Sequence, residues 1–364
     1  MLRVSKAILH VFDFETGAKY FSDTALDLED RQTRSYVQRR LRKITSNPES
    51  RHGAFAEKSN FAGGLQEYAA GDFGFVEFSV QIAQWFWENL RKADETEQCD
   101  LLVADYLDTD AKASLADASD TAGEDGGVSN ASGARAADEA FEGNGRRLFA
   151  IVVLPRRQSF IHDVLSGSNE ILKQDATLPS PTQKVDTYAV IDLDTGAIDF
   201  HDRERSMAGQ SKLVMPELFL QCSSEASSHE VISEVTEIVQ DLAEEYGLEP
   251  AVEVSRAKAA VAAAVEVDET VDPVKVGRRV FEDRPEIQER YEAQAVEKRL
   301  PEEISVKRGP AGRIARNHKI RTDTGIEITF PSEMTNHPGL LEFIRESDGR
   351  MTISIKNVAH IENR

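Results

Sequence analysis

Two predominantly apolar segments constrain the fold of this chain more than any other feature. They are Cys99–Leu107 (CDLLVADYL) and Leu148–Leu154 (LFAIVVL), and neither alternates regularly between apolar and polar residues as a half-solvated strand does. Both are far shorter than the about 20 residues that cross a bilayer as a helix. We therefore expect two neighbouring strands of one sheet covered on both faces, and no membrane span.

The residues before these strands predict a hairpin and three helices. Strand-like runs at Val4–Phe14 and Ala18–Phe21 flank the turn Glu15-Thr16-Gly17. Acids at 27, 29 and 30 favour the start of a helix from residue 31 to about Ile44, because the N-terminal end of a helix attracts negative charge. Apolar periodicity predicts two more helices, at Phe61–Ala69 and Phe75–Leu90.

After the second long strand the pattern changes twice. A second hairpin is expected at Asp186–Leu193 and Ala197–His201, followed by a strand within Leu213–Cys222. Apolar spacing and prolines then predict a helical region with helices at Glu230–Tyr246 and Ala251–Val267 and shorter ones opening at Pro273 and Pro285. The remaining expected elements are strands at Arg313–Arg321, Ile326–Phe330 and Met351–Ile361, with a short helix at Leu340–Arg345.

These expectations define an α+β protein with a sheet-containing N-terminal core, a central helical segment and a small mixed C-terminal domain. The expected boundaries are 1–223, 224–300 and 301–364. Residues 109–145 are mostly Ala, Ser, Gly, Asp and Glu, a composition that buries too little apolar surface to offset chain entropy. We expect this segment to be a disordered acidic insertion.

Two segments rich in Arg and Lys contain no acid, although the whole chain has a net charge of -21. The first spans residues 31–43. A helical wheel places Val37, Leu41 and Ile44 on one face, and the opposite side carries basic residues. A local cationic face acts on DNA within about one Debye length, roughly 8 to 10 Å, whatever the total charge. The basic residues of this segment are Arg31, Arg34, Arg39, Arg40, Arg42 and Lys43.

The second acid-free segment spans residues 305–321, and Gly309-Pro310 and Gly312 predict a flexible first half leading into a strand. Either segment fits phosphate contact or the pairing of its cations with acids elsewhere, which for the second segment are those near Glu234–Glu245, and charge alone leaves both open. The basic residues here are Lys307, Arg308, Arg313, Arg316, Lys319 and Arg321.

The second segment runs into HKIRTDTGIEITFPSEM (residues 318–334), which resembles the C-terminal signature of the bacterial nucleoid-associated protein family. Further similar stretches are DLLVADY at 100, YAVIDL at 188, EEYGLEP at 244 and VFED at 280, so the resemblance covers nearly the whole chain. The acidic insertion is the main departure. The resemblance implies nucleoid association in the bacterial cytoplasm and supplies no catalytic residues.

Two sets of residues invite an enzymatic interpretation instead. Asp-Thr-Gly occurs at 194–196 and 323–325, as in aspartic proteases, but Glu-Thr-Gly at 15–17 indicates hairpin turns as the common cause. Alternatively, metal-dependent phosphodiester cleavage would need the two His-Asp pairs and nearby acids to converge on a divalent ion. Those residues are His162, Asp163, Asp192, Asp194, Asp199, His201 and Asp202. Exposed turn acids explain them more simply.

We therefore expect a protein without enzymatic activity, cofactor or metal that binds DNA, mainly double-stranded and without sequence preference, through phosphate contacts. The alternative is an interaction protein or DNA mimic that a DNA-processing protein recruits. Two cysteines and no signal-peptide pattern favour the cytoplasm. No membrane association is expected, and a homodimer is compatible with the sequence.

Overall fold

The computed structural model describes residues 2–109, 145–163, 170–306, 315–337, 339–346 and 350–360. It divides into two compact units: unit 1 comprises residues 1–45 and 52–224, and unit 2 comprises residues 46–51 and 225–364. The predicted acidic insertion lies, except for its end residues, outside the described residues.

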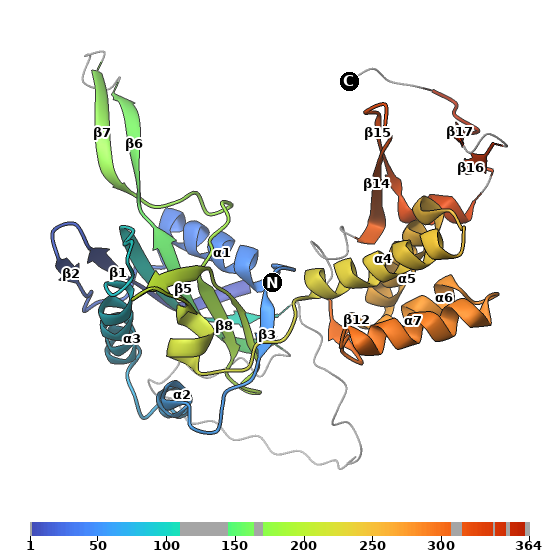
Figure 1. Ribbon diagram of the computed structural model, residues 1–364. Helices are drawn as coiled ribbons and strands as arrows, with labels where there is room; N and C mark the ends of the chain where they lie inside the picture. Colours follow the sequence, from blue (N-terminus) through green and yellow to red (C-terminus); the bar gives the residue numbers. More distant parts are fainter. Residues whose placement is uncertain are drawn as a thin grey trace, which may run out of the picture. The chain divides into compact units, whose positions relative to one another are not determined.

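Unit 1 is built around a seven-stranded sheet with the order β2-β1-β4-β5-β8-β9-β3 (Figure 1). The two long apolar segments form β4 and β5, which pair antiparallel with Val103 opposite Ile151, so their predicted adjacency is confirmed. The strands are β1 Leu2–Asp13, β2 Ala18–Tyr20, β3 Arg51–Gly53, β4 Cys99–Asp108, β5 Arg146–Pro155, β8 Tyr188–Asp192 and β9 Ile198–His201.

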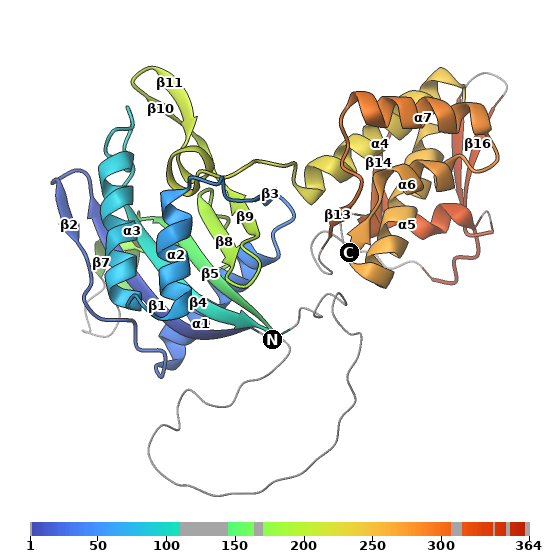
Figure 2. The same cartoon turned by 90° about the horizontal axis from the view of Figure 1, so that it is seen from below.

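Helices cover both faces of this sheet, as the continuous apolar strands predict. Along β4, Leu101 and Val103 pack with α2 (Asn60–Ala70) and α3 (Phe75–Leu90), whereas Leu102 and Ala104 pack with α1 (Arg31–Thr45). Figures 1 and 2 show α1 on one face and α2 with α3 on the other. The cationic helix α1 therefore lies on the face of the sheet opposite α2 and α3.

The three predicted turns are confirmed as hairpin tips. Each ends in a glycine with positive φ, namely Gly17 at 72°, Gly196 at 74° and Gly325 at 87°, a conformation that side chains with a Cβ rarely adopt. Asp192 Oδ1 accepts the amides of Asp194 and Thr195 at 3.0 Å each, so the carboxylate shapes the turn. The Asp-Thr-Gly triplets thus have a structural explanation.

Two predicted elements are wrong. Residues within Leu213–Cys222 form a π-helix, η1 (Val214–Leu220), instead of a strand, and Pro216 there has no amide for a sheet ladder. Residues Leu341–Arg345 form strand β16, which pairs with β17 (Met351–Ile355), instead of a short helix. Five residues are too few for a stable helix, whereas pairing stabilises a strand of that length.

Sequence reasoning also missed two hairpins of unit 1. Strands β6 (Arg157–Asp163) and β7 (Glu170–Thr177) form one, which projects from the sheet (Figure 1), and β10 (Glu204–Met207) and β11 (Gln210–Leu213) form the other.

Unit 2 consists of helices and small hairpins around its own core. Helix α4 begins with a capping box, in which the side chains of Ser227 and Glu230 each accept a hydrogen bond from the other residue's backbone amide. The helices are α4 Ser228–Glu245, α5 Pro250–Asp268, α6 Pro273–Val280 and α7 Pro285–Glu297. The strands are β12 Thr270–Val271, β13 Ile304–Ser305, β14 Asn317–Arg321 and β15 Glu327–Pro331, besides β16 and β17, and η2 Ser332–Asn336 is a 3-10 helix. The mixed α+β class is confirmed.

A buried histidine gives unit 1 a pH-dependent stability. The His10 side chain is fully buried, its Nδ1 accepts the Ser22 amide at 3.1 Å, and its Nε2 lies 3.1 Å from Ser79 Oγ. Because burial disfavours the imidazolium, the pKa of His10 falls from 6.5 to about 4. Its contribution to stability is therefore present above pH 6.5 and is lost as the pH falls toward 4.

We expect His10→Gln to remove this pH dependence. Between pH 7 and pH 4 the free energy of unfolding of the wild type should fall by about 3 kcal/mol more than that of the variant. Urea titrations followed by tryptophan fluorescence measure this difference in unit 1, because Trp85 and Trp87 are the only tryptophans. Equal pH slopes for the two proteins would contradict the expectation.

Candidate nucleic-acid interface

Helix α1 forms as the sequence predicts, with one buried and one basic side. At its start, Asp30 Oδ2 accepts the Thr33 amide at 2.8 Å and acts as the cap. Val37, Leu41 and Ile44 are at most 1% exposed and pack in the core between α1 and the sheet. Burial of these three side chains fixes which side of α1 faces solvent.

The solvent side of α1 carries only cationic and neutral side chains, because the helix contains no Asp or Glu. Its exposed bases are Arg31, Arg34, Arg39, Arg42 and Lys43. Within the described part of the chain, Arg31, Arg39 and Lys43 form no ion pair. Arg34 is partly engaged, since its Nη1 donates to the Leu28 carbonyl at 2.9 Å. Ion pairing among the described residues thus leaves the charges of Arg31, Arg39 and Lys43 unneutralised.

Arg40 is a correction to the predicted basic face. Its side chain is fully buried, and its guanidinium donates to the carbonyls of Gln183 and Ser180 at 2.6 Å and of Pro179 at 3.1 Å. These bonds fasten α1 to the chain segment that precedes β8. Arg40 therefore cannot contact a ligand on the helix surface.

Arg157 is a basic residue near this segment that sequence reasoning missed. It is exposed at the start of β6, and its two Nη atoms lie 3.1 Å from the Gln183 side-chain oxygen when that amide is oriented to accept. Lys184 follows Gln183 and is also exposed. The signal in the sequence is the Arg156-Arg157 pair directly after a buried strand, although Arg156 lies against Asp100 at 3.1 Å.

The second basic segment differs from α1. Lys307, Arg308 and Arg313 lie outside the described residues. Arg316 pairs with Glu266 at 2.8 Å, and Lys319 pairs with Glu327 across the β14–β15 hairpin at 2.7 Å. Arg321 is exposed. Two of the three described cations are thus paired with acids of unit 2, in exposed bridges worth at most about 1 kcal/mol each.

The acids of α4, expected as possible partners of this segment, bind another cation. Lys298 contacts Glu234 and lies 3.7 Å from Glu237.

The conspicuous HKIRTDTGIEITF stretch folds as this same hairpin. His318 is 6% exposed and packs edge-on against Phe330, with ring centroids 5.4 Å apart. Burial, with Lys258 nearby, lowers the pKa of His318 to about 4. These two signature residues stabilise unit 2 and present no charge to a ligand near neutral pH.

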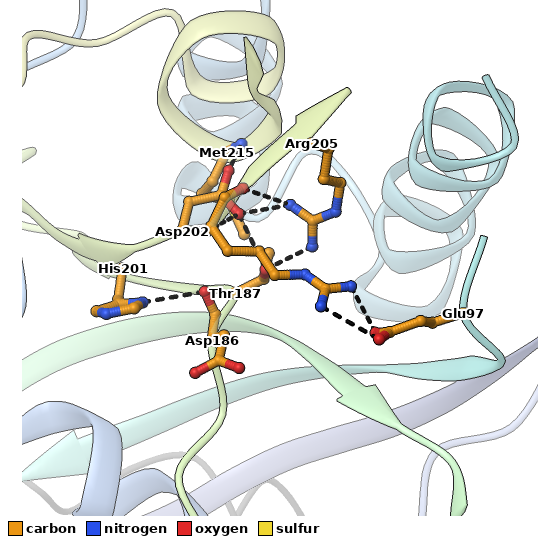
Figure 3. A network of polar contacts seen from close by, with 8 residues as sticks. Glu97, Asp186, Thr187, His201, Asp202, Arg205 and Met215 are labelled. Atoms are coloured by element: carbon orange, nitrogen blue, oxygen red, sulfur yellow. Dashed lines mark hydrogen bonds and ion pairs between the residues drawn. The ribbon is translucent and has the colours of Figure 1, made fainter. Parts of the chain in front are cut away.

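Three of the residues proposed for metal-dependent chemistry, Asp199, His201 and Asp202, have structural partners, and Figure 3 shows those of His201 and Asp202. Asp202 accepts Arg205 Nη1 at 2.7 Å and the Met215 amide at 2.6 Å, and its side chain is fully buried. His201 Nδ1 donates to the Asp186 carbonyl at 3.0 Å. Asp199 pairs with His52 at 2.7 Å. Among the residues that the structure describes, no three His, Cys, Asp or Glu side chains gather in a way that could hold a metal ion.

Within the described residues, no helix combines the length and the apolar character needed to cross a bilayer.

Comparison with protein families decides what kind of protein carries this basic face. The family described as Nucleoid-associated protein YejK matches residues 8–363. The chain belongs to the YejK family. Comparison with curated proteins gives no match. The resemblance drawn from residues 318–334 and the four shorter stretches is thereby confirmed, and the match spans both units of the structure. Membership of the YejK family indicates association with the nucleoid. The YejK family is not a known family of enzymes.

Proposed function

We propose that this YejK-family protein contacts double-stranded DNA directly, without sequence preference, through the solvent side of α1, and organises the bacterial chromosome in the nucleoid. The observation that carries the proposal is the set of exposed cations on a helix without acids, namely Arg31, Arg34, Arg39, Arg42 and Lys43. Arginine fits phosphate well because its planar guanidinium can donate two parallel hydrogen bonds.

The net charge of -21 is the main physical objection. It loses weight because interactions between exposed charges are screened beyond about 8 to 10 Å at physiological salt, so DNA responds to the local face. Part of the negative charge also belongs to residues 110–144, where eight acids face two bases in the sequence. The cations of residues 305–321 are a secondary candidate, since Arg316 and Lys319 would first have to leave their acidic partners.

A titration of duplex DNA by fluorescence anisotropy at several salt concentrations tests the proposal. The logarithm of the affinity should fall linearly with the logarithm of salt, with a slope of about -0.9 for each phosphate contacted. In the variant Arg39→Glu/Arg42→Glu the slope should become shallower by about 2, because two contacts are lost. Duplexes of unrelated sequence should bind alike, since phosphates carry no sequence information.

The matched control is Lys58→Glu/Lys92→Glu, which changes the net charge equally. Lys58 precedes α2 and Lys92 follows α3, and both side chains are exposed. This pair therefore belongs to the helices on the opposite face of the sheet, and its variant should bind DNA like the wild type. If both double variants weaken binding equally, total charge and not the α1 face governs the interaction.

Absence of salt-sensitive binding by the wild type would favour the competing explanation, in which a DNA-processing protein brings this chain to the nucleoid. The acidic helix α4 is the surface to examine in that case. Its exposed acids include Glu237, Asp241 and Glu244.

A further inference from the structure

A pocket in unit 1, on the side of the sheet opposite α1, has a lining unlike the rest of this highly charged protein. Its volume is about 200 Å³, and it lies between α2, α3 and η1. Charged residues make up 29% of the chain, yet none lines this pocket. Its apolar lining consists of Phe61, Phe78, Ile82, Trp85, Leu218 and Phe219.

The apolar walls come from aromatic rings that hold one another in place. Phe219 of η1 lies 4.5 Å from Phe61 of α2 and 4.7 Å from Trp85 of α3, measured between ring centroids. Phe61 stacks on Phe78 at 5.8 Å. Rings in such contacts prefer defined geometries, so the contacts among these walls stabilise the arrangement that the structure shows.

The backbone of one wall is unusual. Residues Val214–Leu220 form a π-helix. Such segments are rare in proteins, and those that occur often lie at functional sites. Gln221, which ends η1 and lines the pocket, has a φ of 53°, which is uncommon for a residue other than glycine. Its side-chain oxygen accepts the Asn60 amide at 3.3 Å and so links η1 to the start of α2.

Three of the residues that line the pocket have side-chain amides. Asn60, Gln81 and Gln221 are all exposed and therefore belong to its solvent side. Amides can donate to and accept from a hydroxyl or a ring N–H. They cannot neutralise an ionic group, and an unpaired charge taken from water into apolar surroundings is strongly disfavoured.

We infer that this pocket binds a small uncharged aromatic molecule of about one ring with a polar substituent, such as a phenol. Cavity size is consistent with this class, because a dry cavity of about 150 Å³ lined by Leu, Ile and Phe accommodates benzene. The ring would pack against Phe61, Trp85 and Phe219, and its substituent would reach the amides. The site is independent of the proposed DNA contact, because α1 packs on the other face of the sheet.

Two adjacent glycines of α2 provide a matched test. A Cβ at Gly64 would lie 3.2 Å from the Phe78 ring, and Gly64 lines the pocket, so a larger side chain there occupies the space of the ligand. A Cβ at Gly63 would meet nothing within 4 Å. Gly64→Leu and Gly63→Leu add the same side chain to the same helix, but only the first fills the pocket.

The experiment uses phenol as the probe, with benzoate as its charged counterpart, on the full-length chain. Saturation-transfer NMR detects binding, and the change in tryptophan fluorescence locates it, because Trp85 lines the pocket and Trp87 does not. We expect phenol to bind the wild type and Gly63→Leu alike. Benzoate should bind at least about tenfold more weakly, and Gly64→Leu should weaken phenol binding by about tenfold or more.

Should Gly64→Leu fail to fold by circular dichroism, Gln81→Phe serves instead, because residue 81 is exposed and a ring there would cover the pocket. Failure of phenol to bind the wild type overturns the proposal. Equal binding to Gly64→Leu and Gly63→Leu, or equal affinities for phenol and benzoate, also overturns it.

Discussion

Gly277→Ala is expected to destabilise unit 2 by about 2 kcal/mol or more. A Cβ at this position of α6 would lie 2.1 Å from two ring atoms of Tyr291 and 2.6 Å from a third. The ring cannot move away easily, because Tyr291 is fully buried on α7 and its hydroxyl donates to the Pro273 carbonyl at 2.9 Å. Overpacking of this kind commonly costs about 1–3 kcal/mol or more, whereas the gain in helix propensity offsets only about 1 kcal/mol.

Far-UV circular dichroism during heating measures the effect, and the midpoint should fall by roughly 10 °C. A double-mutant cycle with Tyr291→Leu gives the control. The smaller side chain relieves the overlap, so the cost of Gly277→Ala should be much lower in the Tyr291→Leu background. An alanine that is tolerated equally well in both backgrounds would show that α6 and α7 do not approach as closely as the structure has them.

The parts of the fold that could be predicted are those encoded by neighbouring residues. The continuous apolar strands β4 and β5 indicate burial on both faces because a run of large apolar residues has no side suited to water. The helix of Ser228–Glu245 and the turns at Gly17, Gly196 and Gly325 also rest on local spacing or on the backbone freedom of glycine.

The parts that could not be predicted have no local signal. In the β6–β7 hairpin, Phe160 and Ile171 are at least 70% exposed, so burial imposes no alternation on either strand. The apolar residues of the π-helix η1 fit a strand equally well, and the amide of Met215 bonds to Asp202, thirteen residues away. Such partners become visible only when the chain is folded.

The candidate interface shows the same limit within a single helix. The wheel correctly placed Val37, Leu41 and Ile44 in the core and the other bases of α1 in solvent. Arg40 also counted among the candidate bases, because an arginine is usually exposed, although the same wheel puts it beside Val37 and Ile44. Its partners lie 139 to 143 residues further along the chain, where carbonyl groups leave no signature in the sequence.

Arg39 and Arg40 are adjacent, and the structure predicts opposite consequences for the same substitution. Arg40→Met removes a buried guanidinium that donates to three carbonyls, and it should lower the free energy of unfolding by about 3 kcal/mol, since hydrogen bonds to a charged group are worth about 1.5–3 kcal/mol each. Arg39→Met alters an exposed side chain and should change stability by at most about 0.5 kcal/mol.

For DNA binding, Arg39→Met should have the larger effect of the two substitutions. If α1 contacts phosphates as proposed, Arg39→Met should make the salt slope shallower by about 1, because one contact is lost. Folded Arg40→Met should keep the wild-type slope, because the buried guanidinium cannot reach a phosphate. Urea unfolding followed by tryptophan fluorescence and anisotropy titrations on the same two samples measure both properties. An Arg40→Met variant of wild-type stability would contradict the anchoring role of Arg40, and a wild-type slope in Arg39→Met would remove this position from the interface.

Arg40→Lys tests the anchoring role further. One ammonium cannot reproduce the donation of a guanidinium to residues 179, 180 and 183, so Arg40→Lys should recover only part of the stability that Arg40→Met loses.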